Sequence, residues 1–312
     1  IFRRYLWGGR RLATLLGKPI GDGDDYAESW ELVDRGRDQS VVQTVPFRGR
    51  NLGELLQERG SAILGRHASR QPFPLLFKFL DAHQNLSVQV HPDDARAIRL
   101  NPPDAGKTEA WVILHADPGS LLFAGLQPGI NRRALEQAIR NGTTQGCLHR
   151  CEPLVGDCFF IPAGTVHALG AGLVVAEVQQ SSDTTFRLFD WNRLGADGKP
   201  RALHLAEALD AVDYERGPVT SQRPEPTRRP HADRLVSCDK FVLDRWTFSE
   251  THPIGGDDRC HFLVVIEGQV AIEGELGQRP LSKGETVLLS ASLGEVVLAP
   301  LARCVMLDIC LP

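Results

Sequence analysis

Short apolar runs separated by turn residues make up most of this chain, and they limit what it can fold into. Runs rich in Val, Leu, Phe and Ile, such as 173–176 and 262–266, end within a few residues at an acid or a glycine, and Gly, Pro, Asn and Asp separate one run from the next. This punctuation is typical of β-strands. The runs are also far shorter than the roughly 18 apolar residues that a membrane-spanning helix needs. We therefore expect a mainly β protein without a transmembrane segment.

Three segments depart from this pattern, and their residue order is typical of helices. Residues 51–59 have Asn51, then Glu54 three positions later, with leucines between and after them. This arrangement is typical of a capped amphipathic helix. Residues 131–140 begin at an asparagine and stop at Asn-Gly, and residues 203–212 form a third helical segment. We expect a few short helices on a β framework.

A proline-rich stretch at 216–231 separates two parts of the chain. It holds four prolines, and Val219 is its only large apolar residue, which suits an extended connector. We therefore expect a first lobe at 1–215, which contains the helices, and a smaller lobe at 232–312.

The second lobe repeats patterns of the first. HFLVVIEGQ resembles TEAWVILHAD, and LSKGETVLLSAS resembles LVGDCFFIPAG. Such a weak internal repeat predicts two related β-barrel lobes of jelly-roll type.

Composition excludes several classes of protein. The net charge is −4, whereas general nucleic-acid and membrane-surface binders need a basic footprint. The seven cysteines are odd in number and form no C-x-x-C pair, which argues against a disulfide framework and a zinc ribbon. Cysteine usage therefore predicts a cytoplasmic protein. The oligomeric state is not predictable from these features.

Four residues on three of the expected strands form a candidate metal site. In SVQVHPDD, Gln89 and His91 are two positions apart, so their side chains project from the same face of a strand. Glu109 interrupts a later apolar run, and His167 follows the Pro-x-Gly turn of GDCFFIPAGTVHAL. Two imidazoles, a carboxylate and an amide form a ligand set suited to Zn²⁺, Fe²⁺ or Mn²⁺. Each residue alone could be structural, and only their joint occurrence indicates a metal.

The same residues resemble the two cupin signatures. Gly156, Asp157, Pro162, Gly164 and His167 match G-D-x4-P-x-G-x2-H. Gln89-x-His91 with Glu109 resembles the other signature, with Gln in place of its leading His.

Nearly the whole chain resembles the short bacterial form of type I mannose-6-phosphate isomerase, a cupin family. The similarity is carried by FKFLDAHQNLSVQVHPDD (77–94), GKTEAWVIL (106–114), GDCFFIPAGTVHALGAG (156–172), VQQSSDTTFRLFDWNR (178–193) and GKPRALH (198–204). The resemblance implies that Gln89, His91, Glu109 and His167 are zinc ligands, with one Zn²⁺ per chain, and that Arg187 is the catalytic arginine. It also implies a degenerate C-terminal cupin lobe, which we expect to hold no metal.

Isomerisation of a sugar phosphate needs a cation at the carbonyl, a base and cations for the phosphate. Lys78 and Lys107 lie near the predicted ligands, and Lys107 shares a strand face with Glu109. We expect Lys78, Lys107 and Arg187 to bind substrate, and Arg187, Lys107 and Glu177 to act in catalysis; exposed surface charge is the alternative for the three cations.

Glu177 interrupts the apolar run LVVAEV. It is either an inward-facing base with a raised pKa or the partner of a buried cation.

The expected partner is a small sugar phosphate, with no nucleic acid and no membrane. Three other functions are consistent with a cupin metal site: an isomerase of a free sugar, a non-catalytic sugar-phosphate-binding protein and an iron-dependent oxygenase.

Overall fold

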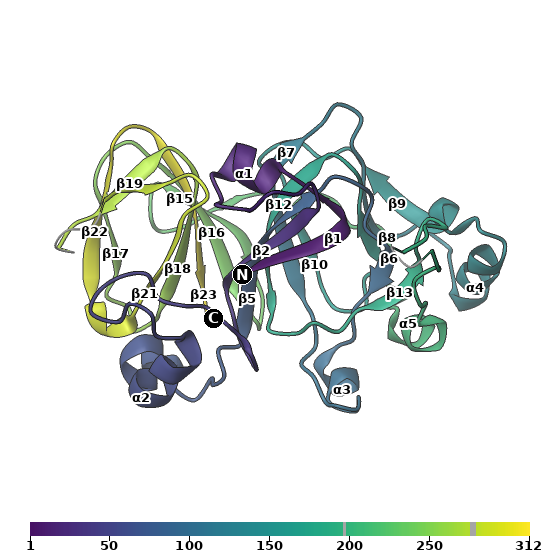
Figure 1. Cartoon of the computed structure of the whole chain (residues 1–312), viewed down its shortest axis with the longest axis horizontal. Coiled ribbons are helices and arrows are strands. Elements are labelled where there is room, and N and C mark those ends of the chain that lie inside the picture. Colours follow the sequence, from purple (N-terminus) through teal and green to yellow (C-terminus); the bar gives the residue numbers. More distant parts are fainter. Residues whose placement is uncertain (196–197, 275–278) are drawn as a thin grey trace.

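Two β lobes lie side by side in the computed structural model, which describes residues 1–195, 198–274 and 279–312 (Figure 1). Each lobe contains two large antiparallel sheets, built from strands between Phe2 and Phe189 in one lobe and between Glu225 and Cys310 in the other. The mainly β prediction is confirmed. Among the described residues, no strand pairing joins the two sheets of a lobe into one closed barrel.

The first lobe contains a six-stranded and a five-stranded sheet. The six-stranded sheet runs, in spatial order, β1 (Phe2–Gly9), β2 (Tyr26–Leu32), β5 (Leu75–Ala82), β12 (Leu173–Gln180), β7 (Glu109–Ala116) and β10 (Cys158–Ile161). The five-stranded sheet runs β13 (Phe186–Phe189), β6 (Val88–Val90), β11 (His167–Leu169), β8 (Leu122–Leu126) and β9 (Leu148–Cys151). A small ladder pairs β3 (Asp34–Arg35) with β4 (Asp38–Gln39).

The second lobe contains a six-stranded and a four-stranded sheet. The larger runs β14 (Glu225–Pro226), β15 (Ala232–Ser237), β16 (Val242–Phe248), β23 (Cys304–Cys310), β18 (His261–Glu267) and β21 (Thr286–Leu289). The smaller runs β17 (His252–Gly255), β22 (Glu295–Pro300), β19 (Gln269–Ile272) and β20 (Leu281–Ser282).

The strands with similar sequences take matching places in the two lobes. β7 and β10 end the first six-stranded sheet, as β18 and β21 end that of the second lobe. The structure therefore agrees with the internal repeat. The short strand β14 falls inside the segment expected to be a connector, and the lobe boundaries at 215/216 and 231/232 stay predictions.

The three expected helices are present, as α2 (Leu52–Leu64), α4 (Arg132–Arg140) and α5 (Leu205–Ala211). Asn51 and Glu54 form the expected capping box of α2. The structure also contains elements that the sequence pattern did not predict: the shorter helices α1 (Arg11–Leu16) and α3 (Asp94–Ala97) and the 3-10 turns η1 (Gly65–His67), η2 (Thr144–Cys147) and η3 (Ala291–Leu293). Among the described residues, no helix is long and apolar enough to span a bilayer.

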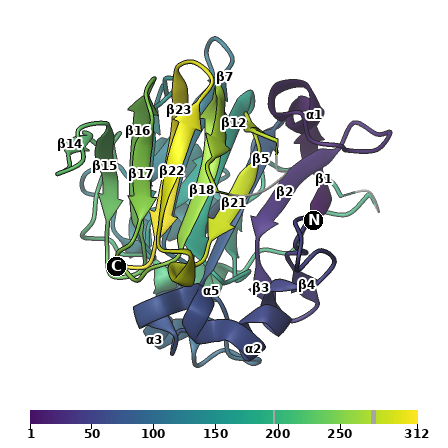
Figure 2. The same cartoon turned by 90° about the vertical axis from the view of Figure 1, so that its left-hand side faces the viewer.

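A shared core lies between the two six-stranded sheets, which face one another across the lobe interface (Figure 2). Phe77 and Phe79 of β5 enter this core, and Phe77 lies 5.2 Å from Phe262 of β18 between ring centroids. Because strand side chains alternate, Lys78 and Leu80 of β5 point the other way, into the first lobe. This alternation turns the polar residues of β5, β7 and β12 toward one interior cavity.

Candidate active site

The residues expected to bind metal converge inside the first lobe. His167 lies opposite Gln89 in the β11–β6 pairing, and Gln89 Nε2 is 3.2 Å from His167 Nε2. Glu109, at the start of β7, reaches both histidines: Oε1 is 3.2 Å from His167 Nε2 and Oε2 is 3.6 Å from His91 Nε2. The potential ligand atoms of His91, Glu109 and His167 lie within 4.8 Å of one another, and all three residues are buried.

Backbone hydrogen bonds fix the orientation of both imidazoles. His91 Nδ1 is 2.9 Å from the Thr184 carbonyl oxygen, and His167 Nδ1 is 2.9 Å from that of Thr165. Each carbonyl can only accept, so each Nδ1 carries the hydrogen and donates it. Each Nε2 then keeps its lone pair for a metal, an arrangement common among histidine ligands.

The electrostatics of this cluster fit a divalent cation. Burial lowers the pKa of His167 to about 4 and that of His91 well below its usual value, so both imidazoles are neutral at neutral pH. Glu109 Oε2 is buried, and its charged neighbour is the Lys107 ammonium group at 3.2 Å. This carboxylate oxygen therefore already faces a cation, and a divalent cation between these ligands would take that place.

Gln89 requires one adjustment to act as a ligand. Its Oε1 lies 3.3 Å from Ser87 Oγ, which donates to it, and its Nε2 faces His167. Only the amide oxygen can coordinate a cation, so the carboxamide has to turn by half a rotation. Ser87 Oγ can accept as well as donate, and it therefore suits either orientation.

Lys107 occupies the centre of the cluster. Its Nζ is 3.1 Å from His91 Nε2 and 3.2 Å from Glu109 Oε2. A metal ion held by these two atoms would take the place of the ammonium group, and Lys107 would then be a cation next to the site.

A buried row of charged residues forms one wall of the site. The register of β5 and β12 places Lys78 opposite Glu177, and Lys78 Nζ lies 3.2 Å from Glu177 Oε1 and 3.4 Å from Glu28 Oε1. Burial alone would lower the pKa of Lys78, but Glu177 and Glu28 outweigh burial and raise it. Burial raises the pKa of Glu177. Glu177 thus faces inward and is the partner of a buried cation, and its role as a base stays a prediction.

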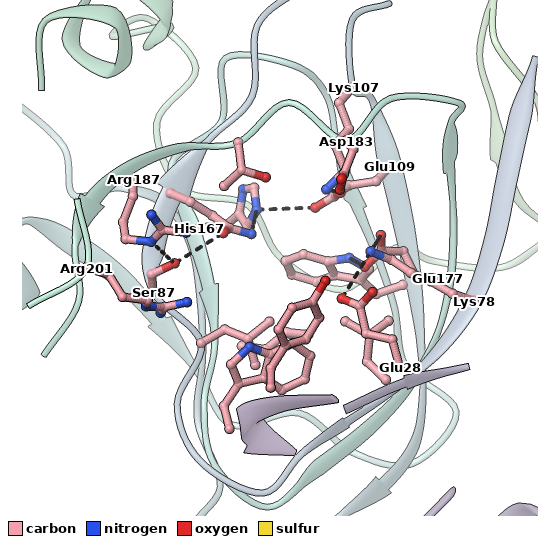
Figure 3. Close-up of a pocket in the computed structure, with 18 residues that line it drawn as sticks. Glu28, Lys78, Ser87, Lys107, Glu109, His167, Glu177, Asp183, Arg187 and Arg201 are labelled. Atoms are coloured by element: carbon pink, nitrogen blue, oxygen red, sulfur yellow. Dashed lines mark hydrogen bonds and ion pairs between the residues drawn. The ribbon is translucent and has the colours of Figure 1, made fainter. Parts of the chain in front are cut away.

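Two arginines form the opposite wall. Arg187 lies opposite Gln89 in the β13–β6 pairing, and its Nε donates to Ser87 Oγ at 3.3 Å. Arg201 Nε donates to Asp190 Oδ2 at 2.7 Å, which fixes its guanidinium group. Arg187 and Arg201 lie together on one side of the site, and Lys78, Glu28 and Glu177 lie on the other (Figure 3).

A cavity of about 270 Å³ joins these groups. It is lined by the two walls, by Gln89, Glu109 and His167 of the candidate metal site, and by aromatic and apolar residues that include Tyr5, Trp7 and Trp111. The arrangement combines a candidate metal site, a carboxylate base candidate and a pair of arginines that can hold an anion.

Comparison with known proteins identifies the family. The chain is 34% identical to mannose-6-phosphate isomerase ManA of Bacillus subtilis over 98% of its own length and 96% of that protein. It is 33% identical to mannose-6-phosphate isomerase of Streptococcus mutans over 92% of its length and 89% of that protein. The chain belongs to the type I mannose-6-phosphate isomerase family.

Domain models and a solved structure agree with this family. Residues 1–110 match the catalytic domain of type I phosphomannose isomerase, and residues 231–307 match the mannose-6-phosphate isomerase cupin domain. The crystal structure of mannose 6-phosphate isomerase from Bacillus subtilis superposes with a TM-score of 0.90 at 29% identity, covering 99% of this chain and 97% of that one.

Hydrogen bonds join the motifs QVHPDD and QQSSDTTFR, on which the resemblance to the isomerase family rests. These bonds lie around the candidate metal site and stabilise it. Gln180 Oε1 accepts from the Thr108 amide at 3.0 Å, and Gln180 Nε2 donates to Asp94 Oδ1 at 2.9 Å. Asp104 accepts from Thr184 Oγ1 at 2.7 Å, beside the carbonyl that orients His91. These hydrogen bonds connect the segment before β7 to the end of β12 and to the residues that follow it.

Two residues of the site, Glu28 and Arg201, were not predicted. Glu28 lies on β2, 50 residues before its partner Lys78, and the segment YAESWEL also contains Glu31, so local sequence did not single out Glu28. Arg201, which the sequence analysis did not select, also lines the cavity and is held by Asp190.

Proposed function

We propose that this chain interconverts mannose 6-phosphate and fructose 6-phosphate at a zinc ion held by Gln89, His91, Glu109 and His167. One observation carries the proposal: Glu109 and His167 of a buried His/Glu/His cluster line a single cavity together with a carboxylate-lysine wall and a pair of arginines. The names of the relatives support the same substrate.

The donor set supports zinc. Neutral imidazoles and a carboxylate are ligands that Zn²⁺ accepts in catalytic sites, and an amide oxygen completes four. When bound, zinc supplies a Lewis acid that polarises a sugar carbonyl.

The proton transfer is assigned to residues of the chain. Glu177 takes the proton from C2 of the aldose and returns it to C1, because its raised pKa places it nearer neutrality than an exposed acid. Lys107 lies beside the cluster and hydrogen-bonds the sugar oxygen that gains and loses a proton. Arg187 contributes a fixed positive charge that favours the enediolate.

Phosphate binding is assigned to the arginine wall. Arg187 and Arg201 can both donate to phosphate oxygens, and their guanidinium groups suit that geometry. Lys78 also lines the cavity, but Glu28 and Glu177 already balance its charge. We therefore assign Lys78 to the sugar hydroxyls and to holding Glu177, rather than to the phosphate.

A coupled assay tests the proposal. Purified protein with zinc should convert mannose 6-phosphate to fructose 6-phosphate, and prolonged treatment with a chelator should abolish the conversion until zinc is returned. Comparable turnover of free mannose would favour a free-sugar isomerase instead. Binding of the sugar phosphate without turnover would favour a non-catalytic binding protein, and uptake of oxygen would favour an oxygenase.

The location in the cell is also a proposal. All seven cysteines are free thiols, which supports a reducing compartment such as the cytoplasm.

A further inference from the structure

A second, smaller cavity lies in the C-terminal lobe, between its two sheets. It measures about 160 Å³ and is lined by β16, β17, the start of β22 and the segment 229–231 before β15. None of the described residues lines both this cavity and the first one, and the proposed isomerisation does not use this cavity.

Two buried nitrogen atoms at this cavity lack hydrogen-bond partners. Trp246 is only 2% exposed, and among the described residues its Nε1 finds no acceptor. His252 Nε2 is also buried and, within the same residues, without a partner. Buried polar groups in folded proteins almost always have a partner. Two such groups on one cavity indicate that the cavity holds something that pairs with them.

Basic side chains complete the lining. The Arg229 guanidinium carbon lies 5.2 Å from the centroid of the Trp246 ring, and within the described parts of the chain no carboxylate forms an ion pair with it. His231 packs on His252 with 3.9 Å between ring centroids. Of the lining residues in the described ranges, Glu295 is the one acid, and its side chain is exposed to solvent.

The donors define the chemistry of the occupant. An indole N–H and a guanidinium group can only donate hydrogen bonds, so the occupant must accept several at once. We propose that this cavity binds a small oxyanion, such as inorganic phosphate, between Arg229, Trp246 and His252. The cavity is smaller than the 270 Å³ of the first site, which favours a single ion over a second sugar phosphate.

The indole N–H of Trp246 provides a local probe of this site. The protein with its zinc is labelled with ¹⁵N, and its indole signals are followed in two-dimensional NMR spectra as sodium phosphate replaces sodium chloride at constant ionic strength and pH. Trp246→Phe identifies the signal of Trp246 by its loss. The indole signals of Trp7 and Trp111, which line the first cavity, report separately on phosphate bound there.

We expect the Trp246 signal to shift with a saturable dependence on phosphate. Arg229→Gln should weaken this binding by about tenfold or more, because a charge-assisted hydrogen bond is lost. Arg228→Gln is the matched control, since Arg228 is exposed and outside the cavity lining, and it should leave the curve unchanged. Arg229→Lys keeps the charge and should retain part of the affinity.

Two results would overturn the proposal. A Trp246 signal that does not respond to phosphate would mean that the cavity holds water only. A response of equal midpoint in the wild type, Arg229→Gln and Arg228→Gln would mean a general effect of the salt. The wild-type titration decides the question even where a variant fails to fold.

Discussion

At the scale of single residues, the hydrogen bond made by Nδ1 of each histidine determines that Nε2 is the atom available to a metal. Thr184 and Thr165 each accept a hydrogen bond through a backbone carbonyl, which leaves the Nε2 atoms of His91 and His167 free for a metal. The positions of the two histidines within the cupin motifs could be recognised in the sequence. The carbonyl groups that orient them could not be predicted, because every residue has a backbone carbonyl and the sequence does not show which one a side chain contacts.

Lys78 provides a test of the buried charge row. Lys78→Met removes the cation between two buried carboxylates, and a buried ion pair that loses one partner typically costs about 3–5 kcal/mol. Urea unfolding should show a loss of this order, whereas Lys78→Arg should recover part of it. A variant as stable as the wild type would mean that the two carboxylates do not depend on this lysine.

Substitution of Arg187 and substitution of Arg201 should affect different kinetic constants. Arg187 contacts Ser87, which in turn contacts the proposed ligand Gln89, so Arg187→Ala should lower kcat by roughly 10²–10³-fold with a smaller change in KM. Arg201→Ala should mainly raise KM for mannose 6-phosphate. A large KM effect with intact kcat in Arg187→Ala would assign that residue to phosphate binding alone.

At the scale of elements, caps and alternation were predictable and cross-strand partners were not. Asn51 and Asn131 cap α2 and α4 as expected, because a cap and its helix are adjacent in sequence. Helix α1 was missed because it is six residues long and has no side-chain cap. The partner of Lys78 in β2 depends on a register between strands 50 residues apart, and local sequence does not contain that register.

His261 links elements of the second lobe, and it predicts a pH dependence. Its Nδ1 lies 2.8 Å from Asp308 of β23 and its Nε2 lies 3.1 Å from Asp257, which precedes β18. Burial alone would lower the pKa of His261, but the two carboxylates outweigh burial and raise it.

A raised pKa in the folded state stabilises the fold fully below the unfolded value of about 6.5, and this stability is lost as pH rises through the folded value. The wild type should therefore exceed His261→Gln in stability by more at pH 6 than at pH 9 in urea unfolding. A difference that is constant, or that grows with pH, would contradict a protonated His261.

At the scale of the whole molecule, the lobe interface is a core rather than a contact between two independent domains. The two six-stranded sheets bury one continuous apolar cluster, in which Phe77 packs against Phe262. Helix α2 precedes most of the first lobe in sequence, yet the turn that follows it is tied to the second lobe, where the Arg66 amide donates to the Asp258 carbonyl at 3.0 Å.

The repeat was visible in the sequence because both lobes keep the same strand pattern. The face-to-face packing of the lobes could not be predicted, because the sequence of an apolar strand face does not show whether that face packs within its own lobe or against the other lobe.

Our central proposal is that one zinc ion held by Gln89, His91, Glu109 and His167 supports the isomerase activity. The most direct measurement is a titration of metal-free protein with Zn²⁺, in which bound zinc and the rate of mannose 6-phosphate isomerisation are followed together. Activity should rise in proportion to bound zinc and level off at one ion per chain, and His91→Ala should lose both tight binding and activity. Full activity in the metal-free protein, or zinc that binds tightly to His91→Ala and restores its turnover, would contradict the account.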